Sequence, residues 1–202
     1  ENLVVVDCRH DLMDANFGTK AYQEGHIAGA VFANLDQDLS GSKVGTDGQF
    51  RGRHPLPNQD DLIQNLRRWG IHNDTQVIAY DAHGGMYAAR LWWLARWLGH
   101  NQVAVLDGGW QAWLELGAPT SSETPAKRRG SFTASVNDHW VNAEFVQTHL
   151  SAICLIDARA PDRFRGENET LDPVGGRIPG ARNRFFRDNL TESGKFKSMA
   201  KL

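Results

Sequence analysis

The sequence predicts an α/β protein built from two copies of one module. Short apolar runs alternate with longer helical patterns, which is typical of a parallel sheet covered by helices on both faces. The chain also opens twice in the same way. Asp7 is followed 19 residues later by His26 of the segment HIAGA, and Asp157 is followed 20 residues later by Arg177 of the segment RIPGA. Because order and spacing both agree, we interpret the two segments as a repeat.

The first copy begins with a strand and an exposed excursion. Leu3–Val6 is a short run of mostly β-branched residues, which predicts a buried strand. Asp36–Gly52 is rich in Gly, Ser, Asp and Lys, so we expect it at the surface. A helix should follow Asn58 and end at Gly70, because these residue types suit the two ends of a helix. Its apolar positions are Leu62, Ile63, Leu66 and Trp69.

Two more strands and two more helices complete the first copy. Val77–Tyr80 and Val103–Leu106 are predicted strands. Met86–Leu98 is apolar nearly all round, which predicts a helix buried on more than one side. The segment DGGWQAWLELG, residues 107–117, predicts a turn and a short helix.

A stretch rich in Ser, Thr and Pro separates the two copies. We expect a first domain at 1–118, a linker at 119–138 and the N-terminal half of a second domain at 139–202. The second copy should contain a helix near Asn142–Leu150 and a strand at Ile153–Ile156. Nothing in it matches the later strands of the first copy, so we expect the second domain to be truncated. The first copy has no room for an opening helix, so the chain should be clipped at both ends.

Composition and charge exclude several classes of protein. Of the 202 residues, 41% are hydrophobic and 23% are charged, which is ordinary for a globular protein. The formal net charge of −2 gives no basic surface for nucleic acid. No apolar run approaches the ~20 residues of a membrane span. We therefore expect neither a nucleic-acid partner nor a membrane partner.

The two cysteines, Cys8 and Cys154, are too few for a disulfide framework. A reducing compartment is favoured, and we expect a cytoplasmic protein. Neither cysteine has a second one at ligand spacing, so no metal is expected. Each lies within or at the end of an apolar run beside an aspartate, whose charge raises a thiol pKa. We therefore expect both cysteines to be buried and structural.

Six motifs in a fixed order carry a resemblance to a known family. They are VVDCR with HIAGA, HPLP, ARLWWLARWLGH, VAVLDGGWQAW with LGAP, LIDARAPDRFRG, and IPGARN. On these motifs the sequence resembles the two-domain rhodanese family, the thiosulfate and 3-mercaptopyruvate sulfurtransferases. It is more similar to the mercaptopyruvate-type branch. The resemblance implies tandem rhodanese-like domains, each a parallel sheet covered by helices.

The resemblance also implies persulfide chemistry in the second domain. In the family, a cysteine after the strand that corresponds to Val77–Tyr80 takes a sulfane sulfur from thiosulfate or 3-mercaptopyruvate and passes it to cyanide or a thiol. Asp81 stands at that position in the first copy, which suits a non-catalytic domain. The same spacing counted from Asp157 ends beyond Leu202. We therefore expect these 202 residues to lack the nucleophile and to be inactive, and we expect no cofactor.

Two arginines match residues that the family points at the anionic end of the donor. They are Arg159 and Arg163. A guanidinium fork suits a carboxylate or sulfonate, because it gives two parallel hydrogen bonds. For Arg159 the alternative is a salt bridge with Asp157 or Asp162.

Asp36 and His54 match an aspartate and a histidine of the mercaptopyruvate enzymes. With a serine of the cysteine loop they would form a proton relay. The alternative for His54 is packing against Pro55 and Pro57. The sequence departs from the family at Arg177, where a histidine usually opens the second motif.

Two further interpretations stay open beside a sulfurtransferase. One is a non-catalytic rhodanese-like module that binds a partner protein, and the other is a relative of the cysteine-dependent phosphatases that share this fold. The segment HGGMYAAR, residues 83–90, places glycines before a helix, where backbone N–H groups are able to cradle an anion. It lacks the lysine and hydroxyl of a phosphate-binding P-loop.

Overall fold

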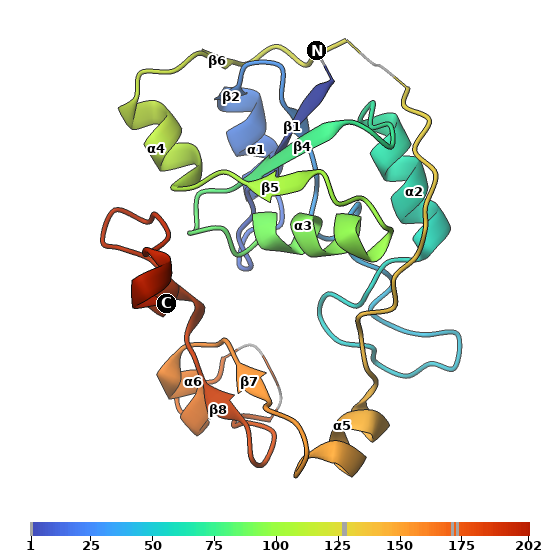
Figure 1. Cartoon of the computed structure of the whole chain (residues 1–202), viewed down its shortest axis with the longest axis vertical. Coiled ribbons are helices and arrows are strands. Elements are labelled where there is room, and N and C mark those ends of the chain that lie inside the picture. The colour runs from blue at the N-terminus through green and yellow to red at the C-terminus, as the bar shows by residue number, and fades with distance from the viewer. Residues whose placement is uncertain (1, 127–128, 171, 173) are drawn as a thin grey trace. The chain divides into compact units, whose positions relative to one another are not determined.

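The structure consists of two compact units (Figure 1). It is a computed structural model that describes residues 2–126, 129–170, 172 and 174–202. Unit 1 is Glu1–Asp138 and unit 2 is His139–Leu202. Among the described residues, no helix is both long enough and apolar enough to cross a bilayer.

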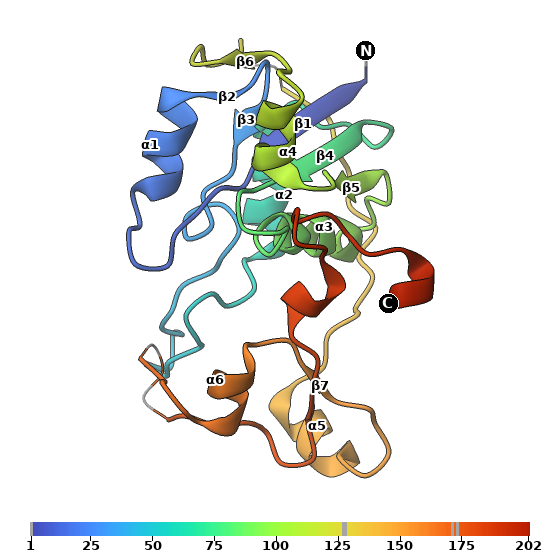
Figure 2. The ribbon, with the colours of Figure 1, turned by 90° about the vertical axis from the view of Figure 1, so that its left-hand side faces the viewer.

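A four-stranded parallel sheet forms the centre of unit 1 (Figure 2). In spatial order its strands are β3 (Val31–Phe32), β1 (Leu3–Asp7), β4 (Gln76–Tyr80) and β5 (Val103–Val105). The three strands expected from the sequence are confirmed to within one residue at their ends. Because the strands run in one direction, the carboxyl ends of β1 and β4 lie side by side, where Asp7 is in register with Tyr80.

Helices cover both faces of this sheet. Helices α2 (Gln59–Arg68) and α3 (Ala88–Trp97) share one core with the sheet, and α4 (Gly109–Glu115) contributes to the core on the other side. Val6 belongs to the first core and its neighbour Val5 packs against the second, as the alternation of side chains along a strand requires. The expected α/β fold with a parallel sheet and covering helices is confirmed.

Four short elements of unit 1 have no counterpart among the expected ones. They are the strand β3 described above, the helix α1 (Phe17–Glu24), and the strands β2 (His26–Ile27) and β6 (Thr120–Ser121). Strand β6 lies in the stretch 119–138 and pairs antiparallel with β2. Further along this stretch, Phe132 is only 1% exposed and packs in the main core. The stretch expected as a linker is therefore partly folded onto unit 1.

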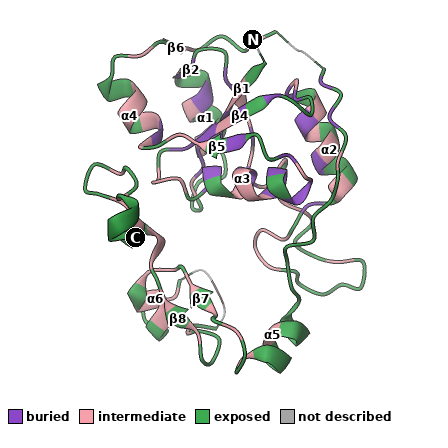
Figure 3. Cartoon of the chain, viewed as in Figure 1, coloured by how far each residue is buried: buried purple, intermediate pink, exposed green. Residues whose placement is uncertain are grey.

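Unit 2 contains α5 (Ala143–His149), β7 (Ile156–Asp157), α6 (Pro161–Arg165), β8 (Arg182–Asn183), and the 3-10 helices η1 (Phe186–Asn189) and η2 (Met199–Lys201). The expected helix is α5. The expected strand boundaries are wrong, because Ile153 donates its N–H to the His149 carbonyl and so closes α5 instead of entering β7. None of the described residues of unit 2 is buried (Figure 3).

Candidate functional site

The carboxylate of Asp36 and the imidazole of His54 lie together in unit 1. Both belong to irregular segments between β3 and α2. Oδ1 of Asp36 is 3.4 Å from Nε2 of His54 and 3.4 Å from Nζ of Lys43. Arg90 donates hydrogen bonds to the carbonyls of His54 and Pro55, which fixes the histidine's backbone. Burial lowers the pKa of His54, while the Asp36 carboxylate acts in the opposite direction. A neutral imidazole at this place is able to accept a proton.

His10 joins this pair, although it is not among the expected site residues. It lies shortly after β1, and its ring centroid is 6.2 Å from that of His54 and 5.3 Å from that of Tyr87. Its side chain is buried, and this burial lowers its pKa. The signal available in the sequence was its position just past the carboxyl end of a central strand. Functional residues of parallel sheets gather at that edge.

Among the residues that the structure describes, the carboxylate of Asp81 accepts hydrogen bonds from backbone N–H groups alone, three in its own loop and one at the first residue of α3. Asp81 follows β4 and is 1% exposed. One carboxylate oxygen accepts hydrogen bonds from the N–H groups of His83 and Gly85, and the other accepts from those of Tyr87 and Ala88, at 2.8–2.9 Å. The loop before α3 therefore does cradle an anion, as its glycines suggest, and that anion is the chain's own carboxylate.

By the resemblance described above, this internal carboxylate stands where a cysteine is expected in the second copy. An anionic donor at this loop would meet a buried negative charge, and the four N–H groups are already engaged. Helix α4 closes the loop from another side. Any side chain at Gly109, whose φ is +55°, would collide with the carbonyl oxygen of Asp81, so only glycine fits there.

The same aspartate–arginine fork occurs in both units. Arg9 donates to Asp7 through its backbone N–H, Nε and Nη2, with the Nη2–Oδ2 distance at 2.6 Å. Arg159 repeats these bonds to Asp157, with the corresponding distance at 2.7 Å. In each unit Nη2 also donates to the carbonyl of the glycine that precedes the second landmark of the repeat. Arg159 therefore makes the salt bridge that was its alternative role.

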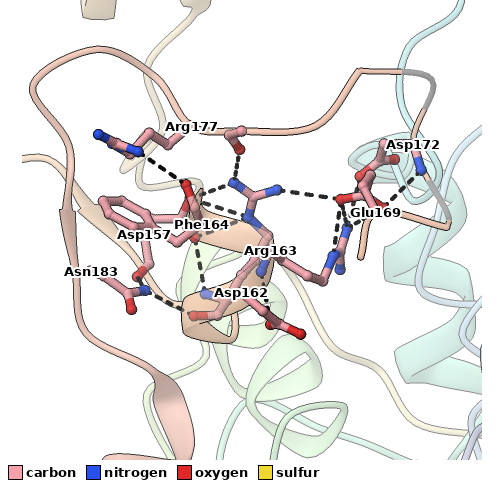
Figure 4. A network of polar contacts seen from close by, with 10 residues as sticks. Asp157, Asp162, Arg163, Phe164, Glu169, Asp172, Arg177 and Asn183 are labelled. Atoms are coloured by element: carbon pink, nitrogen blue, oxygen red, sulfur yellow. Dashed lines mark hydrogen bonds and ion pairs between the residues drawn. The ribbon is translucent and has the colours of Figure 1, made fainter. Parts of the chain in front are cut away.

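Arg163 is also paired within unit 2 (Figure 4). Its Nε donates to Oε2 of Glu169 at 3.0 Å and its Nη2 donates to Oε1 at 3.1 Å, while Nη2 also reaches Asp172 at 2.9 Å. This is the forked geometry that recognises a carboxylate. Arg159 lies 3.9 Å from the same Glu169 carboxylate. The four expected site residues thus lie in two places: Asp36 and His54 are in contact in unit 1, and Arg159 and Arg163 both lie near the Glu169 carboxylate in unit 2.

The two cysteines lie in different environments. Cys8 is buried, and this burial, with a smaller contribution from the Asp7 charge, raises the pKa of its thiol well above the usual range. The expectation of a structural Cys8 agrees with these surroundings. The expectation of a buried Cys154 is wrong, because β7 begins only at Ile156 and leaves this thiol exposed.

A cavity of about 590 Å³ in unit 1 contains none of these residues. Its lining includes Tyr22, Phe32, Trp69, His72 and Pro125. Among the described residues, the lining includes one histidine, His72, and no cysteine or carboxylate. The chemistry of the side chains, rather than the size of a hollow, therefore identifies the candidate site.

The chain is similar to known proteins over nearly its whole length. Residues 1–116 match the family model described as a rhodanese-like domain. The chain is 43% identical over 199 residues to a probable 3-mercaptopyruvate sulfurtransferase of Pseudomonas aeruginosa, covering 96% of this chain and 69% of that protein. It is 35% identical over 191 residues to the thiosulfate sulfurtransferase of Rattus norvegicus, covering 91% and 62%.

A solved structure agrees with these relatives. The 3-mercaptopyruvate sulfurtransferase from Leishmania major superposes with a TM-score of 0.83 at 29% identity, covering 99% of this chain and 56% of that one. The chain therefore spans between 56% and 69% of the length of these three proteins.

Proposed function

Because this chain belongs to the rhodanese family, we propose that it forms part of a sulfurtransferase. The enzyme moves a sulfane sulfur from a small anionic donor, thiosulfate or 3-mercaptopyruvate, to cyanide or a thiol through a cysteine persulfide. The observation that carries the proposal is the likeness to sulfurtransferases along nearly the whole chain, together with the contact between Asp36 and His54. Two free thiols favour a cytoplasmic place for the enzyme, and its chemistry calls for no cofactor.

The proposal includes a second rhodanese-like copy in unit 2. Strand β7 pairs in parallel with β8 over two residues, as β1 pairs with β3, and the aspartate of the same aspartate–arginine fork ends both β1 and β7. Ile156 of β7 is 51% exposed, which suits a sheet that continues with further strands. These features support residues 139–202 as the N-terminal half of a second, truncated domain. Residues 1–118 are then the non-catalytic first domain and residues 119–138 the connection.

In this proposal Asp36 and His54 form the proton relay. A neutral His54 accepts a proton from the hydroxyl of the serine in the cysteine loop, and Asp36, 3.4 Å away, stabilises the imidazolium that results. Arg163 meets the carboxylate or sulfonate of the donor. In the absence of a donor, the Glu169 carboxylate binds the guanidinium of Arg163. The anionic end of the donor then takes the place of this carboxylate. Arg159 has a structural role in the loop after β7, because it makes the same fork to an aspartate that Arg9 makes in the non-catalytic copy.

The first test is whether sulfur is bound covalently. We expect the 202-residue chain to gain no sulfur from 3-mercaptopyruvate, because Cys8 is buried and Cys154 precedes a strand instead of following one. A longer chain with a complete second copy should gain one sulfur atom and release thiocyanate from cyanide. Intact mass measured before and after incubation gives the answer. A gain on the short chain that disappears in Cys154→Ser would assign the persulfide to Cys154. A complete protein inert with both donors would favour a protein-binding module instead.

A conservative change at Arg163 tests the substrate fork. In the complete enzyme, Arg163→Lys should raise KM for the donor by about 10–100-fold, because lysine keeps the charge and loses the two parallel hydrogen bonds. Arg165→Lys is the matched control, since Arg165 is exposed and pairs only locally with Glu167 among the described residues. Steady-state kinetics with thiosulfate and 3-mercaptopyruvate measure both variants. Equal KM values for the two variants would remove Arg163 from the site.

A further inference from the structure

Three potential metal ligands from distant parts of the sequence converge in unit 1. One ligand atom each of His10, Asp36 and His54 lies within 4.8 Å of the other two. His10 follows β1, Asp36 follows β3, and His54 precedes α2. Two imidazoles and one carboxylate form a donor set typical of zinc sites with an open position. The expectation of no metal rested on the spacing of cysteines, which carries no information about this cluster.

The closest pair of ligand atoms already has the separation that a shared ion needs. Zinc binds nitrogen and oxygen at about 2.0–2.1 Å, so two ligands of a tetrahedral ion lie about 3.3 Å apart. Nε2 of His54 and Oδ1 of Asp36 are 3.4 Å apart. That oxygen is buried and has no hydrogen-bond partner in the part of the chain that the structure describes. The two atoms therefore have the separation of two ligands of one tetrahedral ion, and no hydrogen bond joins them.

His10 supplies the third ligand from a buried position. It is only 3% exposed, and its ring makes edge-on contacts with the rings of His54 and Tyr87. Within the described ranges of the chain, no hydrogen bond reaches either ring nitrogen. The fully buried side-chain atoms without a hydrogen-bond partner in the described part of the chain include Oδ1 of Asp36 but neither ring nitrogen of His10, so the case for His10 rests on how its ligand atom converges with the other two.

The surrounding charges permit a cation. Lys43 lies 3.4 Å from the same Asp36 oxygen, but its side chain is 57% exposed and can turn into solvent when an ion binds. Asp11 adds a negative charge to the field at His10. The nearby cation Arg90 is already engaged by backbone carbonyls. Lys43 is thus the group that a metal ion has to displace.

We propose that His10, Asp36 and His54 bind one divalent transition-metal ion, with Zn²⁺ preferred and water in the fourth position. The donor set and its spacing also accept Co²⁺, which serves as a coloured probe of the same site. A bound ion would occupy the same His54 nitrogen and Asp36 carboxylate as the proposed proton relay, so the two uses exclude each other at any one time. Metal titration tests the binding without any measurement of sulfur transfer.

Titration of the metal-free chain with Co²⁺ and then Zn²⁺ tests the proposal. The chain should bind one Co²⁺ with visible absorption bands of low-symmetry coordination, and Zn²⁺ should remove these bands. His10→Phe keeps a ring against Tyr87 and Asp36→Asn keeps the side-chain shape. Each should weaken Zn²⁺ binding in calorimetry by more than the ~10–100-fold that loss of an outer-sphere partner costs. Lys43→Met should strengthen Zn²⁺ binding, because it removes the competing cation.

His149→Gln is the matched control, because His149 is an exposed histidine of α5 in the other unit. Its Zn²⁺ affinity should equal that of the unmodified chain. The proposal is overturned if the unmodified chain binds no Co²⁺ at one ion per chain. It is equally overturned if folded His10→Phe and Asp36→Asn bind Zn²⁺ as tightly as the control. Circular dichroism establishes which variants are folded, and two ligand variants ensure that one misfolded protein does not decide the result.

Discussion

Replacing Asp81 with asparagine should lower the free energy of unfolding by about 2–4 kcal/mol. The carboxylate accepts four backbone hydrogen bonds, two on each oxygen. An asparagine keeps one oxygen and turns an NH2 group toward two N–H donors, which then lose their acceptor. Because Asp81 is 1% exposed, water cannot replace the missing acceptor. Urea denaturation followed by tryptophan fluorescence measures the change.

A matched aspartate controls for the loss of charge alone. Asp60 is exposed in the first turn of α2, so Asp60→Asn should change the free energy of unfolding by less than about 1 kcal/mol. Formate offers a second check, because it should stabilise Asp81→Ala more than the unmodified protein by entering the emptied cradle. If both aspartates gave the same small loss, the four backbone bonds would contribute nothing net.

Arg9→Met should destabilise the protein by about 3–5 kcal/mol, whereas Arg159→Met should cost about 1 kcal/mol or less. The two arginines make the same fork, but the side chains of Arg9 and Asp7 are 5% and 0% exposed and those of Arg159 and Asp157 are 32% and 14% exposed. Removing Arg9 leaves a fully buried carboxylate without its cation. Its remaining side-chain partner is the hydroxyl of Tyr80, which donates at 2.7 Å. Solvent screens the carboxylate of Asp157 when Arg159 is removed.

Amide hydrogen exchange in urea resolves the two units and so assigns each loss to its own fork. The double variant Asp7→Asn with Arg9→Met should recover part of the Arg9→Met loss, because it removes the unpaired charge. Equal losses from the two methionine variants would show that burial does not set the value of the fork.

The elements that the sequence predicts correctly are those whose local signals and burial agree. Helix α2 has its expected Asn58 cap, which accepts from the Asp60 N–H, and it buries the expected Leu62 and Leu66. Helix α1 buries only Gly18 and Tyr22, so its apolar pattern is too weak to predict a helix from the sequence. Strands of two residues, such as β2 and β6, depend on a partner far along the chain, and no local pattern predicts them.

The site shows the same division. The family resemblance indicates Asp36 and His54, whose role stays a prediction, whereas the approach of His10 depends on how three segments fold around the end of the sheet. The partner of Arg163 could not be chosen from the sequence, since several acids lie nearby and only the folded loop selects Glu169. For a similar reason, the sequence does not show which anion the loop before α3 binds. Its glycines indicate a binding loop, but only the fold shows that Asp81 fills it.

Phe132 determines where an autonomously folding fragment has to end. The backbone N–H of Gly130 donates to the carbonyl of Arg67, and that of Phe132 donates to the carbonyl of Ile71. The phenyl ring of Phe132 is buried in the main core. The match to the family model ends at residue 116, well before Phe132. A fragment excised at that border would carry an open hole beside α2 and would be vulnerable to proteases. Cleavage after residue 138 would release a fragment with its core intact.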